Sequence, residues 1–90
     1  MKTLHLVSQS VLPDAFSLAI ASGDAIVLFA EGTYLANPGI RSELAETLPC
    51  YVLGDDMLVR GLQVEPKLSE IIDYKKFVEL TLKFDRSISW

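Results

Sequence analysis

The sequence contains few of the residues that build disulfide frameworks and metal sites. It has one cysteine, Cys50, and one histidine, His5, among its 90 residues. A single cysteine excludes an internal disulfide and any metal site with several thiolate ligands. It also fits the reducing conditions of the cytoplasm, where we expect the protein to be located. We therefore expect no metal and no other cofactor.

Long hydrophobic runs and common catalytic motifs are absent as well. No stretch approaches the roughly 20 apolar residues needed to span a bilayer. The opening residues 1–10, MKTLHLVSQS, lack the apolar core of a signal peptide. The sequence also lacks the glycine-rich G-x-G-x-x-G and G-x-x-x-x-G-K-[ST] nucleotide-binding motifs and the G-x-S-x-G motif of hydrolases. These absences predict a protein that does not contact membranes and does not belong to those enzyme classes.

Basic residues are outnumbered by acidic ones. Lysine and arginine total 8, aspartate and glutamate total 12, and the net charge is −4. Because the affinity for a phosphate backbone comes mainly from basic side chains, we expect no direct binding of nucleic acid. Half of the residues are nevertheless hydrophobic, and contiguous exposed apolar patches usually mark partner surfaces. We therefore expect a complex, or a homodimer when the chain is isolated.

The pattern of apolar residues predicts alternating strands and helices. Strands are expected at residues 3–7, 25–30, 50–53, 69–73 and 87–90, and helices at 12–23, 37–48, 54–61 and 74–84. The run AIVLFA at 25–30 is apolar throughout, which is typical of a parallel strand covered on both faces. The sequence predicts one compact, flavodoxin-like α/β domain over residues 1–90. Its mainly parallel sheet has about four to five strands, with helices on both faces.

Cys50 is the first chemical candidate, because a thiolate is a nucleophile and can carry sulfur. It opens the predicted strand 50–53 directly after Pro49, which would place it at the amino end of the sheet. Reactive groups in such folds gather at the opposite, carboxyl end. The neighbouring sequence also shows no cation or helix start that would activate the thiol. We interpret Cys50 as a core residue, with a sulfur-carrying thiol as the alternative.

Asp55 and Asp56 follow the predicted strand 50–53 and should lie at the carboxyl end of the sheet. Adjacent carboxylates can act as an acid–base pair or bind a metal, but no histidine or third carboxylate accompanies them. The favoured interpretation is a helix cap that complements the helix dipole, and the alternative is a contact with a partner subunit. Arg60 is expected to form a salt bridge at the helix end, and the alternative is again a contact with a partner subunit.

His5 and Trp90 are the remaining candidates. His5 lies within a predicted strand and is expected to have a satisfied ring, although it could form a nucleophile–base pair with Cys50. Trp90 is expected to plug the end of the sheet or, alternatively, to anchor an interface, since aromatic residues are enriched there. No catalytic residue is assigned. The partner-contact candidates are Asp55, Asp56, Arg60 and Trp90.

Four stretches of the sequence are shared with a known family. They are LHLVSQS at 4–10, GDAIVLFAEGTYLA at 23–36, YVLGDDMLVRGL at 51–62 and IDYKKFVELTLKFDRSISW at 72–90. The last two are the more specific, since they combine L-x-x-D-x-x-x-R-G, I-D-Y-x-x-F-V-x-L-T and a final tryptophan. Through these stretches the sequence resembles, over nearly its whole length, the TusB or DsrH-like family of small sulfur-relay proteins with the DsrE-like fold.

This resemblance implies a particular assembly and pathway. Members join two sister proteins, TusC-like and TusD-like, in a heterohexamer that is a dimer of heterotrimers. The complex passes persulfide sulfur toward 2-thiolation of the tRNA wobble uridine, and the relay cysteine belongs to the TusD sister. Some members carry a cysteine in the first helix, but residues 14–23, DAFSLAIASG, contain none. The resemblance therefore implies a non-catalytic subunit.

Three alternatives to that function remain. The first is a persulfide carrier that acts through Cys50. The second is a DsrEFH-type subunit in dissimilatory sulfur oxidation. The third is a stand-alone module that binds a small ligand at residues 54–56.

Overall fold

A five-stranded parallel sheet forms the centre of the molecule. The computed structural model describes residues 1–36, 48–62 and 69–90. The strands in these ranges are β1 (Thr3–Val7), β2 (Ala25–Leu28), β3 (Cys50–Leu53), β4 (Glu70–Ile72) and β5 (Arg86–Ser89). Their order is β4-β3-β2-β1-β5, and every neighbouring pair is parallel. All strands therefore end at one side of the sheet, the carboxyl edge, and begin at the opposite side, the amino edge.

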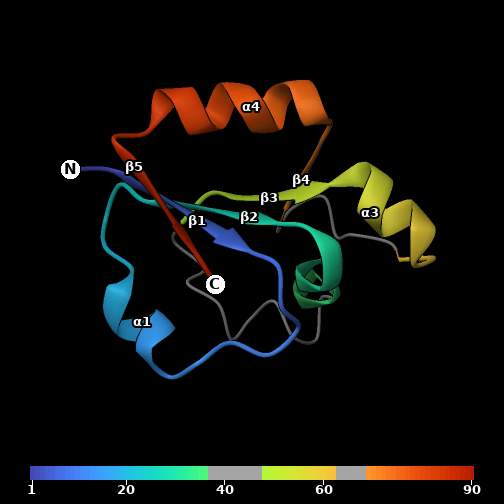
Figure 1. Ribbon diagram of the computed structural model, residues 1–90, viewed down its shortest axis with the longest axis horizontal. Helices are drawn as coiled ribbons and strands as arrows, with labels where there is room; N and C mark the ends of the chain where they lie inside the picture. Colours follow the sequence, from blue (N-terminus) through green and yellow to red (C-terminus); the bar gives the residue numbers. More distant parts are fainter. Residues whose placement is uncertain (37–47, 63–68) are drawn as a thin grey trace.

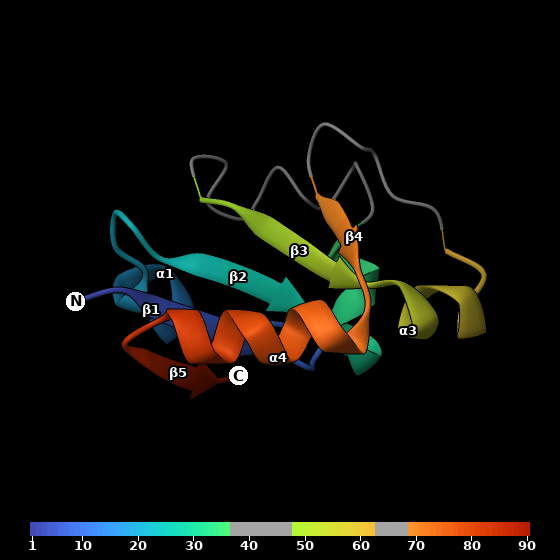
Figure 2. The same ribbon diagram turned by 90° about the horizontal axis from the view of Figure 1, so that it is seen from above.

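Helices cover both faces of this sheet, which confirms the predicted α/β fold. The described helices are α1 (Ala15–Ala19), the 3₁₀ helix η1 (Ala30–Ala36), α3 (Gly54–Val59) and α4 (Tyr74–Lys83). α4 lies on one face, α1 and η1 lie on the other, and α3 projects beyond the carboxyl edge (Figure 1). Because β4 and β5 form opposite edges, α4 carries the chain across the sheet between them, as the view from above shows (Figure 2).

The core consists of two apolar clusters, one on each face of the sheet. The cluster under α4 contains Leu4, Ala25, Val27, Ile72 and Leu80. The cluster on the α1 and η1 face is larger and includes Val7, Phe16, Ile26, Leu28, Leu35, Cys50, Val52 and Met57. Every residue of β2 is buried, because side chains that alternate between the two faces are covered on both. Burial on both faces explains why the sequence is apolar without interruption at 25–30.

Several predicted boundaries differ from the structure. The helix predicted at 12–23 is only Ala15–Ala19, because the backbone N–H of Ala21 donates to the Asp24 side chain and Ile20 is already extended. The strand predicted at 25–30 ends at Leu28. Ala30 has a φ of 49° and turns the chain into η1. The helix predicted at 37–48 lies outside the described residues, apart from Leu48.

Gly32 explains why the chain can turn so tightly after β2. A Cβ atom at this position would overlap the backbone oxygen of Val7. That oxygen already accepts a hydrogen bond of 3.0 Å from the N–H of Phe29. Glycine is therefore required here because η1 approaches the end of β1 closely. The contact fixes η1 against the carboxyl edge, beside α3.

Candidate functional site

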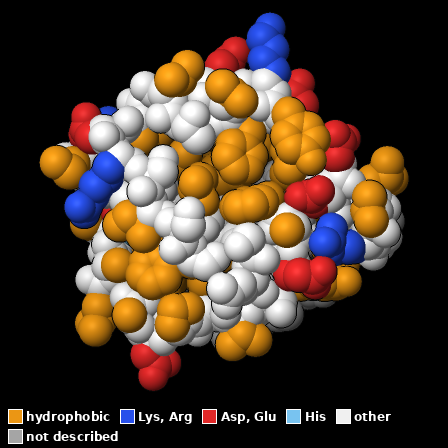
Figure 3. Space-filling view, in the orientation of Figure 1, with side chains coloured by type: hydrophobic (Ala, Val, Ile, Leu, Met, Phe, Trp, Pro, Cys, Tyr) orange, Lys and Arg blue, Asp and Glu red, His pale blue; other side chains and the backbone are white. Residues whose placement is uncertain are grey.

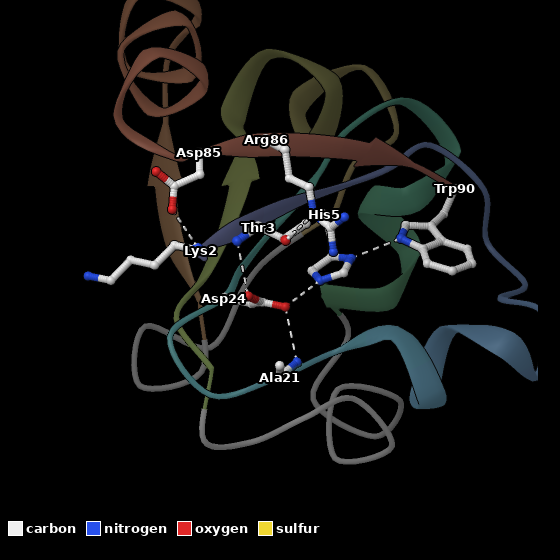
Figure 4. A network of polar contacts seen from close by, with 8 residues as sticks. All are labelled: Lys2, Thr3, His5, Ala21, Asp24, Asp85, Arg86 and Trp90. Carbon is white, nitrogen blue, oxygen red and sulfur yellow. Dashed lines mark hydrogen bonds and ion pairs between the residues drawn. The ribbon is translucent and has the colours of Figure 1, made fainter.

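A buried polar network joins β1, the turn before β2 and the end of β5 (Figure 4). His5 is 0% exposed, and its Nε2 lies 2.8 Å from Oδ2 of Asp24. Its other ring nitrogen, Nδ1, accepts a hydrogen bond of 3.0 Å from the indole N–H of Trp90. Asp24 also accepts from the backbone N–H groups of Thr3 and Ala21, both at 3.0 Å. One carboxylate thus receives three donors, two from β1 and one from the turn before β2.

The partners of His5 determine the position of its proton. An indole N–H can only donate a hydrogen bond, so Nδ1 of His5 must be the acceptor. The proton of the neutral ring is therefore on Nε2, from which it is donated to Asp24. Both ring nitrogens are occupied, as predicted for a satisfied sheet histidine. The nucleophile–base pair with Cys50 is not formed, because His5 has no nitrogen left to activate a thiol.

Asp24 is ionised within this network. Burial by itself would raise the pKa of the carboxyl group, but the hydrogen bond from His5 and those from the Thr3 and Ala21 backbone outweigh it. The net effect is a pKa below the ordinary value of 3.8 for an aspartate side chain. The sequence interpretation did not include Asp24. The available signal was a charged residue directly before the apolar run at 25–30, but nothing local indicated that it would be buried.

Cys50 lies at the amino edge, where the sequence predicted it. It is the first residue of β3, is 5% exposed and packs in the cluster on the α1 and η1 face. Its register partner on β2 is Ile26. Reactive thiols sit in partly exposed surroundings, so this position is that of a core residue.

Asp56 and Arg60 connect α3 to the start of η1. Oδ2 of Asp56 accepts a hydrogen bond of 2.6 Å from the N–H of Ala30. Arg60 donates to the backbone oxygen of Asp56 and to Oε1 of Glu31, at 3.0 and 3.1 Å. The salt bridge expected for Arg60 is thus present. The expected helix cap is wrong, since α3 begins at Gly54 without a side-chain cap and Asp56 binds the turn at Ala30 instead. Asp55 and Asp56 do lie in the first turn of α3, where the helix dipole favours acidic residues, as expected.

Asp55 faces solvent beside a shallow hollow at the β4 side of the carboxyl edge. Gly54, Glu70, Asp73 and Lys76 also line this hollow. Asp73 uses Oδ1 to cap α4 through the N–H of Lys76, at 2.8 Å. In the described ranges no group of three acidic, cysteine or histidine residues is placed to hold a metal.

Trp90 closes the sheet beside α1. Its ring lies edge-on to Phe16, with centroids 5.2 Å apart, and packs against the cluster on that face. The backbone N–H of Trp90 donates to the backbone oxygen of Leu6, and the backbone oxygen of Trp90 accepts from the N–H and the hydroxyl of Ser8. These contacts support the interpretation of Trp90 as a plug.

Large apolar side chains remain exposed on two helices. Leu58 and Val59 of α3 are each 81% exposed. On α4, the residues Tyr74, Val78 and Leu82 repeat at intervals of four and are 57%, 57% and 81% exposed, which makes an outward apolar stripe. Figure 3 shows hydrophobic side chains gathered between α4 and the sheet, and again where α3 projects. Such patches on a small domain mark surfaces for partners.

Comparisons with known proteins agree with this fold. A family model described as "DsrH like protein" matches residues 8–87. A protein from Pectobacterium parmentieri named "Protein TusB" is 33% identical, over 97% of this chain and 99% of its own length. The protein of the same name from Salmonella typhimurium is 31% identical, over 100% of this chain and 99% of its own.

A solved structure is similar as well. The solution structure of protein Tm0979 from Thermotoga maritima superposes with a TM-score of 0.65 at 27% identity, covering 90% of this chain and 92% of that one. None of the helices in the part of the chain that the structure describes has the length and apolar character of a membrane span.

The role of Asp24 predicts how stability depends on pH. Replacing Asp24 with asparagine removes the charge that three donors bind, so we expect a loss of about 2 kcal/mol at pH 7. The folded state lowers the pKa of Asp24. The contribution of Asp24 to the free energy of unfolding is therefore fully present above the ordinary pKa of 3.8 and is lost as the pH falls through the lowered pKa of the folded state. Urea unfolding from pH 7 to pH 3 should show the two proteins converging.

The exposed Asp14, whose side chain forms no cap hydrogen bond at the start of α1, provides the control for this measurement. Asp14→Asn should stay close to the wild type at every pH. A cost of Asp24→Asn that is as large at pH 3 as at pH 7 would contradict the role of the charge.

The role of Asp56 predicts a second change in stability. Asp56→Ala removes the acceptor for the N–H of Ala30, which is held in the left-handed region, and should cost about 1–2 kcal/mol. Asp56→Asn keeps an acceptor oxygen and should recover most of that loss. The exposed neighbour Asp55 is the control, and Asp55→Ala should leave the urea midpoint nearly unchanged. Equal effects of the two alanine variants would rule out the assigned contact.

Proposed function

The chain belongs to the DsrH-like family, and from this membership we propose that it is a non-catalytic subunit of a TusBCD-type sulfur relay in the cytoplasm. In this role it joins TusC-like and TusD-like sister subunits in a heterohexamer. The complex supports 2-thiolation of the wobble uridine in tRNA, and the sulfur-carrying cysteine is on a sister subunit.

The position of Cys50 is the observation that carries this proposal. A persulfide relay needs a sulfur that a donor and an acceptor protein can both reach. The sulfur of Cys50 lies in a residue that is 5% exposed, inside an apolar cluster and at the edge opposite the carboxyl ends of the strands. This chain has no second cysteine. A chain of this kind contributes to a relay by shaping the complex.

The exposed apolar surface supports the assembly part of the proposal. α3 projects from the carboxyl edge (Figure 1), and Leu58 and Val59 on it are almost fully exposed. Asp55 is exposed on the same helix, while Asp56 and Arg60 are held by contacts within the chain. We assign the partner contact at this edge to Leu58, Val59 and Asp55. Asp56 and Arg60 act there by fixing the orientation of α3.

The charge of the chain supports the absence of direct tRNA binding. A net charge of −4 disfavours contact with a phosphate backbone. Recognition of the RNA is therefore left to other proteins of the relay. Dissimilatory sulfur oxidation uses a related assembly, and the tRNA pathway is the one that we propose.

Cys50→Ala tests the non-catalytic role. In cells that lack the native gene, the variant should restore 2-thiouridine in tRNA to the wild-type level, because the sulfur does not pass through this chain. Alkylation of Cys50 in the folded protein should also be much slower than alkylation of an unfolded control. Loss of thiolation in a complex that still assembles would show that Cys50 carries sulfur.

Substitution on α3 tests the partner surface. Leu58→Glu combined with Val59→Glu should abolish co-purification with the two co-expressed sister subunits, because charges would be buried at the contact. Leu18→Glu on α1, at a side chain that is 88% exposed, is the matched control and should leave the complex intact. Circular dichroism should show that both variants fold. If the double variant assembles normally, α3 is not the contact.

A further inference from the structure

His5 lies between two partners that have opposite effects on its protonation. The carboxylate of Asp24, at 2.8 Å from Nε2, favours a positive ring. The indole N–H of Trp90 points at Nδ1 and is a donor. A proton added to Nδ1 would therefore face another N–H group. The two contacts can coexist only while His5 is neutral.

Few other charges surround the ring. In register with His5 stand Ile26 on β2 and Ile88 on β5, and α1 contributes the ring of Phe16, with centroids 5.6 Å apart. Lys2 and Asp85 lie at the exposed end of the network, where Oδ2 of Asp85 accepts from the backbone N–H of Lys2 at 2.7 Å (Figure 4). The charged group that contacts Thr3 is Arg86, whose Nε donates to the hydroxyl of Thr3 at 2.9 Å. Its positive charge acts against a second positive charge on His5. Protonation is thus decided by Asp24 on one side and by Trp90 and Arg86 on the other.

We propose that the His5–Trp90 hydrogen bond is a pH-sensitive clasp that holds the end of β5 against α1. As the pH falls, a solvent proton binds Nδ1 of His5 and the bond from the indole is lost. The imidazolium stays paired with Asp24, whose oxygens keep their backbone donors from Thr3 and Ala21. Only the contact to Trp90 is broken, so the change is confined to the edge of the sheet.

The clasp has a defined consequence for the surface. The indole of Trp90 covers the apolar cluster beside α1, where its ring contacts that of Phe16. Among the described strands, β5 lies at the edge of the sheet and pairs with β1 alone. Release of the indole therefore uncovers apolar surface between α1 and β5, and the clasp couples the exposure of that surface to pH.

The experiment uses the fact that Trp90 is the sole tryptophan of the chain. Between pH 8 and pH 5, where histidines titrate, the wild-type indole emission should move to longer wavelength. The NMR signal of the indole N–H should shift and exchange faster, in step with the ring signals of His5. Far-UV circular dichroism should stay constant. The glutamine in His5→Gln retains a hydrogen-bond donor and an acceptor but cannot titrate. The indole emission and the indole N–H signal of this variant should therefore not change with pH.

Two results would overturn the clasp: a flat profile in the folded wild type, or the same transition in His5→Gln. Trp90→Phe provides a second measurement if the glutamine variant does not fold. It keeps an aromatic ring but removes the N–H that opposes a proton on Nδ1, so the ring signals of His5 should change at a higher pH than in the wild type. An unchanged or lower midpoint would show that Trp90 does not oppose protonation.

Discussion

The carboxylate of Asp24 is the constraint on which much of this structure depends. It binds the N–H of Thr3 at the start of β1 and the N–H of Ala21 at the end of the first crossover. Through His5 it also orients the ring that receives Trp90. A buried charge is tolerated only when its hydrogen bonds are satisfied, and these three donors satisfy it. The bond from Ala21 lies directly after the end of α1, and the bond from His5 orients the ring that meets the end of β5.

The two edges of the sheet differ in the residues that they bury and expose. The amino edge contains Asp24 and Cys50, both buried and engaged in the architecture. The carboxyl edge contains η1 and α3, joined by Asp56 and Arg60, and presents apolar side chains to solvent. This division supports the proposed role, in which the chain contributes a shaped surface to a complex and the sulfur chemistry takes place on another chain.

The buried pair of Asp24 and His5 resembles the aspartate and histidine of a catalytic triad. The residue bound to the other ring nitrogen of His5 shows that the pair is not part of a triad here. In a triad the histidine accepts a proton from a nucleophile. In this chain the corresponding nitrogen, Nδ1 of His5, accepts from the indole of Trp90, which has no nucleophilic oxygen or sulfur. The pair therefore fixes a strand instead of activating a reaction.

The sequence by itself determined the order of the strands and of the α-helices in the described ranges, because apolar runs and the glycines beside them follow local structure. It also placed Cys50 at the amino edge, since the position of a residue within a strand fixes its edge in a parallel sheet. It did not predict η1, which depends on the close approach of Gly32 to the end of β1. The contacts of Asp24, Asp56 and Trp90 were decided only by the tertiary structure. Apart from Ala21, which is three residues from Asp24, the partners of these side chains lie between 19 and 85 residues away along the chain. No local pattern specifies which donor a carboxylate will meet across such a distance, and for Asp56 the distant N–H of Ala30 replaced the local helix cap that propensity favours.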